Sequence, residues 1–198
     1  MNISDLLKDP QKLEEIFEKA LKKRNKELAH LLIPYIKDLY LIYEYARKVV
    51  EGKVDDELED IIAQDPEYSF YYALNVLKGP FLKGEDVIAK DPQYSYLYAF
   101  DVIGGPWPKG EDAIAQDPCW SFHYALNVIK GPWPKGEDAI TQSAYFSYQY
   151  AKEVLNDRFK KGEDVIIKDR FHLDYYLDFL KSKGKLEEFY RDHPELKR

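Results

Sequence analysis

The sequence contains one cysteine and one methionine among 198 residues, and no long uncharged hydrophobic run. A single cysteine excludes an intramolecular disulfide framework and fits a reducing compartment. The lack of about 18 consecutive apolar residues excludes a membrane-spanning helix. The opening residues MNISDLLKDPQ are too acidic and polar for a secretory signal. We therefore expect a cytoplasmic protein without a membrane partner.

Basic residues are also in the minority, because the formal net charge is −7 at pH 7. This balance speaks against direct binding to nucleic-acid phosphates. Apolar residues make up 45% of the chain and aromatic residues 15%, with 17 tyrosines. Such a composition excludes a disordered chain and supplies much aromatic contact area with polar tips.

A repeat of 26 residues runs through the chain. One copy reads KGEDAIAQDPCWSFHYALNVIKGPWPKG, from Lys109 to Gly136. Several residue types recur at this period: Glu59, Glu85, Glu111, Glu137 and Glu163; Tyr72, Tyr98, Tyr124, Tyr150 and Tyr176; Ala73, Ala99, Ala125 and Ala151. A fixed period of this length is typical of repeat proteins, in which each unit buries its apolar face against its neighbours.

Within one copy the sequence predicts a short helix over Gly110–Gln116 and a longer one that begins at Asp117-Pro118 and is closed by Gly131-Pro132. Alternating apolar residues between Trp120 and Val128 also suit a strand, as in leucine-rich repeats. The diverged copies break this alternation but keep an i, i+3, i+4, i+7 stripe. We therefore predict an all-α fold, an α-solenoid of short-helix/long-helix hairpins with a cap at each end.

The predicted organisation is one continuous domain with three parts. Residues 1–37 form N-terminal capping helices, residues 38–183 the helical-repeat solenoid, and residues 184–198 a C-terminal capping half-repeat. In the solenoid, the aromatic residues of the connecting loops are expected to cover the joints between copies: Phe81, Trp107, Trp133 and Phe159. The basic end of the first helix is interpreted as a solvated helix C-terminus.

Positions that differ between copies are free to serve function. On the long helix, five such positions are spaced i, i+4, i+7, i+8 and i+11 and form one face, called here the variable stripe. Mixed aromatic, apolar and charged residues on one face are typical of a protein-binding surface. The predicted partner-binding residues are Tyr71, Leu97, Phe100, Asp101, His123, Asn127, Gln149 and Glu153. Random variation of exposed positions is the competing interpretation.

No motif in the sequence predicts catalysis. Cys119 and His123 are four residues apart on a helix, but a zinc site needs further ligands at matching spacing. The repeated Glu-Asp pairs suit the first turn of a helix, and neighbouring pairs are too far apart for one catalytic dyad. The glycines match neither a P-loop nor a dinucleotide fingerprint. We therefore expect a protein that is not an enzyme, with no metal and no cofactor.

The string DPxYSxxYAxxVIKGPWPKGEDAIA resembles short tyrosine-rich repeats of bacteriophages and other large DNA viruses, over about residues 38–183. The resemblance implies a small viral protein that binds a host protein, and that inhibits a host defence. It implies no site residues. The predicted function is a non-catalytic protein-binding scaffold. The alternative is an acidic mimic of nucleic acid that occupies a DNA-binding enzyme or nuclease.

Overall fold

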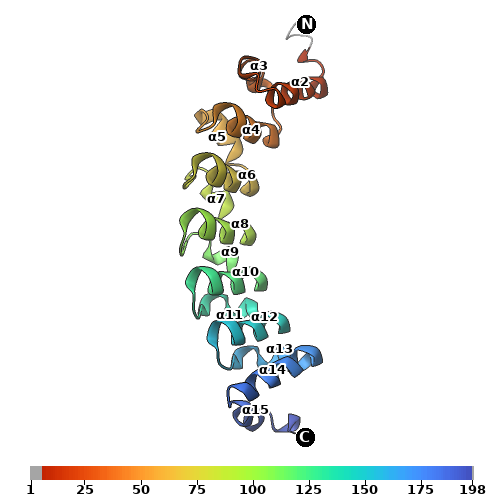
Figure 1. Ribbon diagram of the computed structural model, residues 1–198, viewed down its shortest axis with the longest axis vertical. Coiled ribbons are helices and arrows are strands. Elements are labelled where there is room, and N and C mark those ends of the chain that lie inside the picture. Colours follow the sequence, from red (N-terminus) through yellow and green to blue (C-terminus); the bar gives the residue numbers. More distant parts are fainter. Residues whose placement is uncertain (1–5, 198) are drawn as a thin grey trace. The chain divides into compact units, whose positions relative to one another are not determined.

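The computed structural model describes residues 6–197, and every regular element within this range is a helix (Figure 1). The predicted all-α repeat fold is therefore confirmed, and the strand interpretation of the long segment is wrong for all described copies. Backbone contacts divide the chain into two compact units, residues 1–88 and 89–198. Each unit is described by itself.

The first unit contains the N-terminal helices and the first regular repeat. Its elements are α2 (Pro10–Lys22), α3 (Lys26–Leu32), η1 (Ile33–Tyr35), α4 (Leu39–Tyr45), η2 (Ala46–Val50), α5 (Asp56–Ile62), α6 (Pro66–Tyr71), η3 (Tyr72–Leu77) and α7 (Glu85–Ile88).

The second unit contains the remaining repeats and the C-terminal helices. Its elements are α8 (Pro92–Leu97), η4 (Tyr98–Ile103), α9 (Glu111–Ile114), α10 (Pro118–His123), η5 (Tyr124–Ile129), α11 (Pro134–Ile140), α12 (Ala144–Gln149), η6 (Tyr150–Leu155), η7 (Lys160–Gly162), α13 (Glu163–Lys168), α14 (Arg170–Ser182), α15 (Leu186–Asp192) and η8 (Pro194–Leu196).

The long helix of each repeat begins where the Asp-Pro signal predicts. The carboxylate of Asp117 accepts a hydrogen bond from the backbone N–H of Trp120 at 3.0 Å, and Pro118 is the first helical residue. This arrangement satisfies one of the unpaired N–H groups at the start of the helix. Asp65 and Asp91 cap their helices in the same way, and Ser143 takes this place before α12.

The second half of each long helix before α14 is π-helical, which the sequence pattern did not indicate. η5 follows α10 directly, and the carbonyl of Ala125 accepts hydrogen bonds from the N–H groups of both Lys130 and Gly131. The left-handed residue that ends the helix is Lys130 (φ 58°), and not the glycine that follows it. π-Helical turns are rare and usually isolated. Here the turn recurs in five successive long helices, η2 to η6, so it belongs to the architecture of the repeat.

A serine and a glycine allow the long helix to pack closely against the next short helix. Ser121 is fully buried and donates its hydroxyl to the carbonyl of Ile114 at 2.8 Å. A Cβ atom added to Gly136 would lie 2.9 Å from the Cβ of Ser121 and 2.3 Å from the ring of Trp133. Only glycine fits this contact between α10 and α11 without displacing its neighbours.

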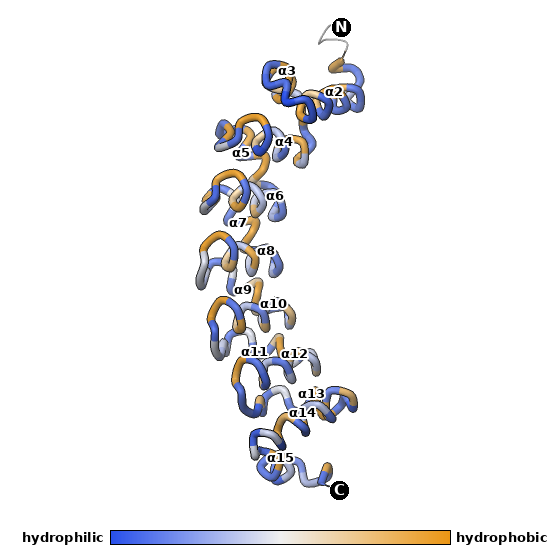
Figure 2. The backbone as a smooth tube through the Cα atoms, viewed as in Figure 1, coloured by the Kyte–Doolittle hydropathy of each residue, from blue (hydrophilic) through white to orange (hydrophobic). Residues whose placement is uncertain are grey.

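The recurring tyrosines form the centre of the core. The ring of Tyr124 is fully buried and packs against Trp133 with 4.7 Å between centroids. The backbone N–H of Trp133 also donates to the hydroxyl of Tyr150 in the next copy at 2.8 Å, so the loop aromatic lies between two recurring tyrosines. In the second unit the long helices α8, α10, α12 and α14 contact each other in sequence order, and in the first unit α4 contacts α6. Figure 2 shows apolar segments recurring in each repeat beside hydrophilic ones.

Candidate functional site

The recurring Glu-Asp pairs are structural. The hydroxyl of Tyr124 accepts a hydrogen bond from the backbone N–H of Trp107 at 2.9 Å and donates one to Glu111 at 3.1 Å. Burial raises the pKa of Tyr124 to about 12, so the hydroxyl keeps its proton at neutral pH. Equivalent contacts join Tyr72 to Glu59 and Tyr150 to Glu137. The glutamate of the pair therefore completes a buried hydrogen-bond network.

The aspartates that follow these glutamates are exposed but paired. The ammonium of Lys135 lies 2.8 Å from Asp112 and 3.4 Å from Glu111, and Lys161 lies 2.8 Å from Asp138. In each case the lysine comes from the following repeat. Acids along this edge of the second unit thus alternate with lysines, whereas a nucleic-acid mimic needs a continuous acidic edge. The arrangement gives no support to the alternative function predicted from the sequence.

Five of the eight predicted partner-binding residues are half-buried: Tyr71, Leu97, His123, Asn127 and Gln149. Two of them contact Tyr96 of the preceding repeat. Asn127 donates its amide to the hydroxyl of Tyr96 at 2.9 Å, and the ring of His123 lies 6.0 Å from that of Tyr96. Tyr71 is placed similarly in the first unit, 6.3 Å from Tyr43. These side chains join neighbouring repeats within a unit and present only part of their surface.

The other three predicted residues are exposed: Phe100, Asp101 and Glu153. Phe100 is 48% exposed and stacks on Tyr96 with 5.9 Å between ring centroids. Asp101 follows it on η4, and Glu153 lies on η6, 3.0 Å from the ammonium of Lys152. The eight residues form no single contiguous cluster. They are distributed over α6, α8, η4, α10, η5, α12 and η6.

The largest exposed aromatic cluster lies on α12 and α14 and includes residues that the sequence analysis missed. Tyr145, Phe171 and Tyr175 are 45%, 63% and 50% exposed. Phe171 and Tyr175 occupy the variable stripe of the last, degenerate copy, one period after Tyr145 and Gln149. The unbroken 26-residue register could have found them, had the stripe been extended into that copy.

Ring contacts make this cluster continuous. Tyr145 lies 5.7 Å from His172, Phe171 lies 5.0 Å from Tyr175, and Tyr148 stacks on Tyr175 at 6.3 Å with 30° between the planes. His172 also contacts Phe171 at 5.2 Å. We call the five rings Tyr145, Tyr148, Phe171, His172 and Tyr175 the aromatic patch. Exposed apolar groups gathered in this way mark interaction sites more often than scattered ones do.

Cys119 and His123 lack the electrostatics of a nucleophile and its base. Burial raises the pKa of the Cys119 thiol and lowers the pKa of the His123 imidazole. Both shifts favour the neutral forms, whereas a reactive cysteine needs a stabilised thiolate. Within residues 6–197 no three His, Cys, Asp or Glu side chains are grouped closely enough to hold a metal ion.

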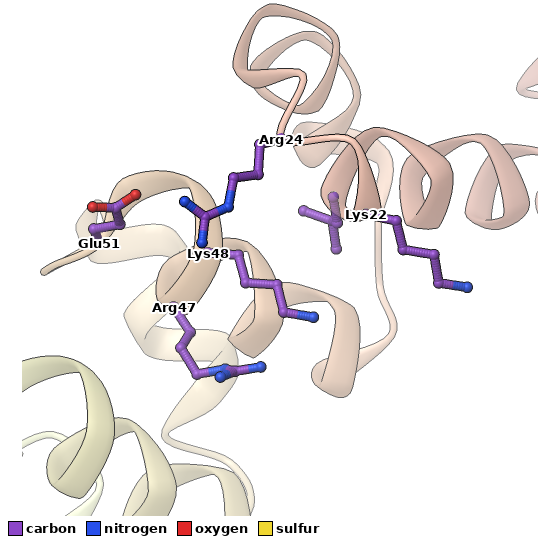
Figure 3. Close-up of a pocket in the computed structure, with 6 residues that line it drawn as sticks. Lys22, Arg24, Arg47, Lys48 and Glu51 are labelled. Carbon is purple, nitrogen blue, oxygen red and sulfur yellow. The ribbon is translucent and has the colours of Figure 1, made fainter.

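A cleft of about 440 Å³ in the first unit is lined by four basic residues, Lys22, Arg24, Arg47 and Lys48, together with Leu21 and Glu51 (Figure 3). The buried carboxylate of Glu44 binds Arg47 at 2.6 Å and also pairs with Lys48, while Lys22 pairs with Glu18 at 3.1 Å. Three of the four cations therefore already have a carboxylate partner. Because these cations also lie near helix C-termini, they complement the helix dipoles.

No helix in the described part of the chain is long and apolar enough to cross a membrane. Comparisons of the chain with protein-family models, with curated proteins and with solved structures found no match. The surface itself is therefore the only guide to function.

Proposed function

We propose that this chain is a non-catalytic helical-repeat scaffold that binds another protein through the aromatic patch on α12 and α14. The observation that carries the proposal is the exposure of Tyr145, Phe171 and Tyr175 in one cluster of ring contacts, on positions whose residue type varies between repeats. Large aromatic side chains with a polar tip are enriched at protein interfaces and dominate binding energy.

The residues that recur from repeat to repeat form no comparable exposed surface. The recurring tyrosines, serines and loop aromatics are buried, and the pairs Glu111-Asp112 and Glu137-Asp138 are held by the lysines described above. The contribution of these residues to stability explains why they recur. Apart from ring contacts with one another, the patch residues satisfy no buried group. Binding to a partner therefore explains their aromatic character better than stability does.

The resemblance to viral repeats would make the partner a host protein and the result an inhibited defence. This extension of the proposal depends on that resemblance alone. It predicts that the partner comes from the host proteome and that binding lowers the partner's activity.

Site-specific photo-crosslinking tests the proposal. A photo-reactive phenylalanine analogue replaces Tyr175 in one sample and Asp112 in another, inside the cells in which the protein occurs. We expect a discrete crosslinked protein from position 175 and none from position 112, because Asp112 lies on the lysine-paired edge. Equal crosslinking at both positions, or capture of the same partner by a Tyr145→Ser, Phe171→Ser and Tyr175→Ser variant, would refute it.

A further inference from the structure

The outer face of α14 carries two carboxylates between its two exposed rings. Phe171, Asp174, Tyr175 and Asp178 follow the spacing i, i+3, i+4, i+7 and so share one face of the helix. All four are exposed. A continuous stripe of ring, acid, ring and acid is therefore presented to solvent, beside Tyr148 and Tyr145 of the preceding long helix.

The two carboxylates differ from Asp112 and Asp138 of the regular Glu-Asp pairs in having no ion-pair partner among residues 6–197. Neither Asp174 nor Asp178 forms an ion pair or hydrogen bond with a side chain of residues 6–197, although Arg170 and Lys181 are on the same helix. By contrast, the exposed aspartates Asp112 and Asp138 are each held by a lysine at 2.8 Å. Asp174 and Asp178 are therefore available to a charged group of a partner beside the aromatic patch, whereas Asp112 and Asp138 are already paired.

An exposed ring with an unpaired carboxylate one helical turn away is suited to a cation. The face of an aromatic ring attracts a positive charge, more often an arginine than a lysine. A carboxylate binds the planar guanidinium through two parallel hydrogen bonds, which the compact ammonium of lysine cannot make. Phosphates would be repelled by both aspartates, so a nucleic-acid strand fits this stripe poorly.

Building on the proposed function, we infer that the partner presents an arginine-rich segment to α14. Asp174 and Asp178 are one turn apart, about 6 Å along the helix axis. Two arginines separated by one residue in an extended segment are about 6.6 Å apart. One arginine then pairs with each aspartate while its guanidinium lies against Phe171 or Tyr175. The net charge of −7 attracts such a segment over a longer range.

Binding of three synthetic peptides to the full chain tests this inference. The probes are fluorescent 12-residue peptides in which serine alternates with arginine, with lysine or with glutamate, measured by anisotropy at low and at physiological salt. We expect the arginine peptide to bind at least about five times more tightly than the lysine peptide. The glutamate peptide should not bind. Equal affinity for arginine and lysine, or tighter binding of the glutamate peptide, would overturn the inference.

Two matched variants separate the stripe from general charge. Asp174→Asn with Asp178→Asn removes the unpaired acids and should weaken arginine-peptide binding about tenfold, which is about 1.4 kcal/mol. Asp112→Asn with Asp138→Asn changes the net charge equally, on the lysine-paired edge, and should leave the affinity within about twofold. If both double variants lost the same affinity for the arginine peptide, binding would depend only on the net charge of the chain and the inference would be wrong.

Crosslinking at position 175 and the affinity of the Asp174→Asn, Asp178→Asn variant together distinguish this inference from the proposed function. If a partner crosslinks at position 175 but binds the Asp174→Asn, Asp178→Asn variant as tightly as the wild type, the scaffold stands and the arginine inference fails. If no partner crosslinks at position 175, the proposed function fails as well.

Discussion

Glu111 and Glu163 occupy equivalent positions two repeat lengths apart in the second unit, yet their charges are balanced by different partners. Glu111 faces Lys135 of the following repeat at 3.4 Å. For Glu163 the corresponding position of the chain is Glu187, which cannot supply a cation. Instead Arg158, which replaces the proline of the regular repeats, forms two hydrogen bonds of 2.8 Å with Glu163.

This difference shows how the array is ended. Glu111 takes its cation from Lys135, 24 residues further along the chain, whereas Glu163 takes it from Arg158, five residues before it. The guanidinium also binds Asp192 at 2.8 Å, and His193 lies 3.1 Å from Glu163, so the C-terminal helix α15 is tied to the same network. Burial raises the pKa of Glu163, but hydrogen bonds from Arg158, His193 and Tyr176 outweigh it and hold the pKa below its ordinary value.

Breaking the terminal ion pair should have the largest effect. Arg158→Met leaves the buried carboxylate of Glu163 without its main partner, so we expect the free energy of unfolding to fall by about 3–5 kcal/mol in urea titrations. The pKa of Glu163 is lower in the folded protein than in the unfolded chain. The ionised carboxylate therefore contributes fully to stability above its pKa in the unfolded chain, and this contribution is lost as the pH falls through its pKa in the folded protein. The variant should therefore lose less stability on acidification.

The regular repeat provides the control for this change. Glu111→Gln affects a partly exposed group whose cation is also exposed, so a cost of about 1 kcal/mol or less is expected. The double variant Arg158→Met, Glu163→Gln should recover part of the loss. Equal costs for Arg158→Met and Glu111→Gln would contradict the distinction between terminal and regular repeats.

The buried tyrosines should make the regular repeats sensitive to alkali. The pKa of Tyr124 is raised to about 12 by burial, against about 10 in the unfolded chain. Its contribution is therefore complete below pH 10 and is lost as pH rises from 10 to 12, by about 2–3 kcal/mol. Tyr124→Phe should lose that much less stability than the wild type over this range, measured by urea unfolding at fixed pH values.

A phenolic hydroxyl on the variable surface is the matched control. Tyr145→Phe removes an exposed hydroxyl that accepts a hydrogen bond only from Gln149. The alkaline loss of this variant should equal that of the wild type. The account of the tyrosine network would be wrong if Tyr124→Phe and Tyr145→Phe behaved alike.

Gly131, in the connecting loop, and Gly136, in α11, should respond differently to a methyl group. Gly136→Ala places a carbon 2.3 Å from the ring of Trp133, and we expect a loss of about 2 kcal/mol through repacking. Gly131→Ala meets nothing within 4 Å and should change stability by no more than about 0.5 kcal/mol. Thermal unfolding followed by circular dichroism distinguishes the two; similar melting temperatures would refute the close approach of α10 and α11.

The smallest expected effect concerns the end of the π-helical turn. Lys130 has a φ of 58°, and Gly104 has the same role in the previous repeat with a φ of 73°. Lys130→Gly should stabilise the chain by about 0.5–1 kcal/mol, and Gly104→Lys should destabilise it by a similar amount. Chemical denaturation measures both, and changes of the same sign would contradict the assignment of left-handed conformation.

The sequence predicted what local rules determine and missed what depends on neighbours. Asp117-Pro118 marks the helix start because capping is a local interaction. The left-handed Lys130 was missed because the long helix ends in a π-helical turn, in which the N–H groups of Lys130 and Gly131 both donate to the carbonyl of Ala125. The burial of Arg158 could not be predicted from the sequence pattern, because only the fold brings Asp192 and Glu163 close to it.

The variable stripe shows the same limit for the candidate site. The 26-residue period identifies equivalent positions of successive long helices, but the exposure of each side chain could not be predicted from the period. Tyr96, which resembles a core residue, extends toward the next repeat and covers part of His123 and Asn127. The last copy lacks the Gly-Pro exit, so its stripe was not followed to Phe171 and Tyr175.

The affinity of the arginine peptide for one double variant, measured together with its stability, tests the central claim most directly, because the claim separates residues that hold the repeat from residues that bind. The Phe171→Ser, Tyr175→Ser variant should bind the peptide about ten times more weakly than the wild type, with an unchanged free energy of unfolding to within about 1 kcal/mol. The converse result, unchanged affinity together with a large loss of stability, would place these rings in the core and contradict the account.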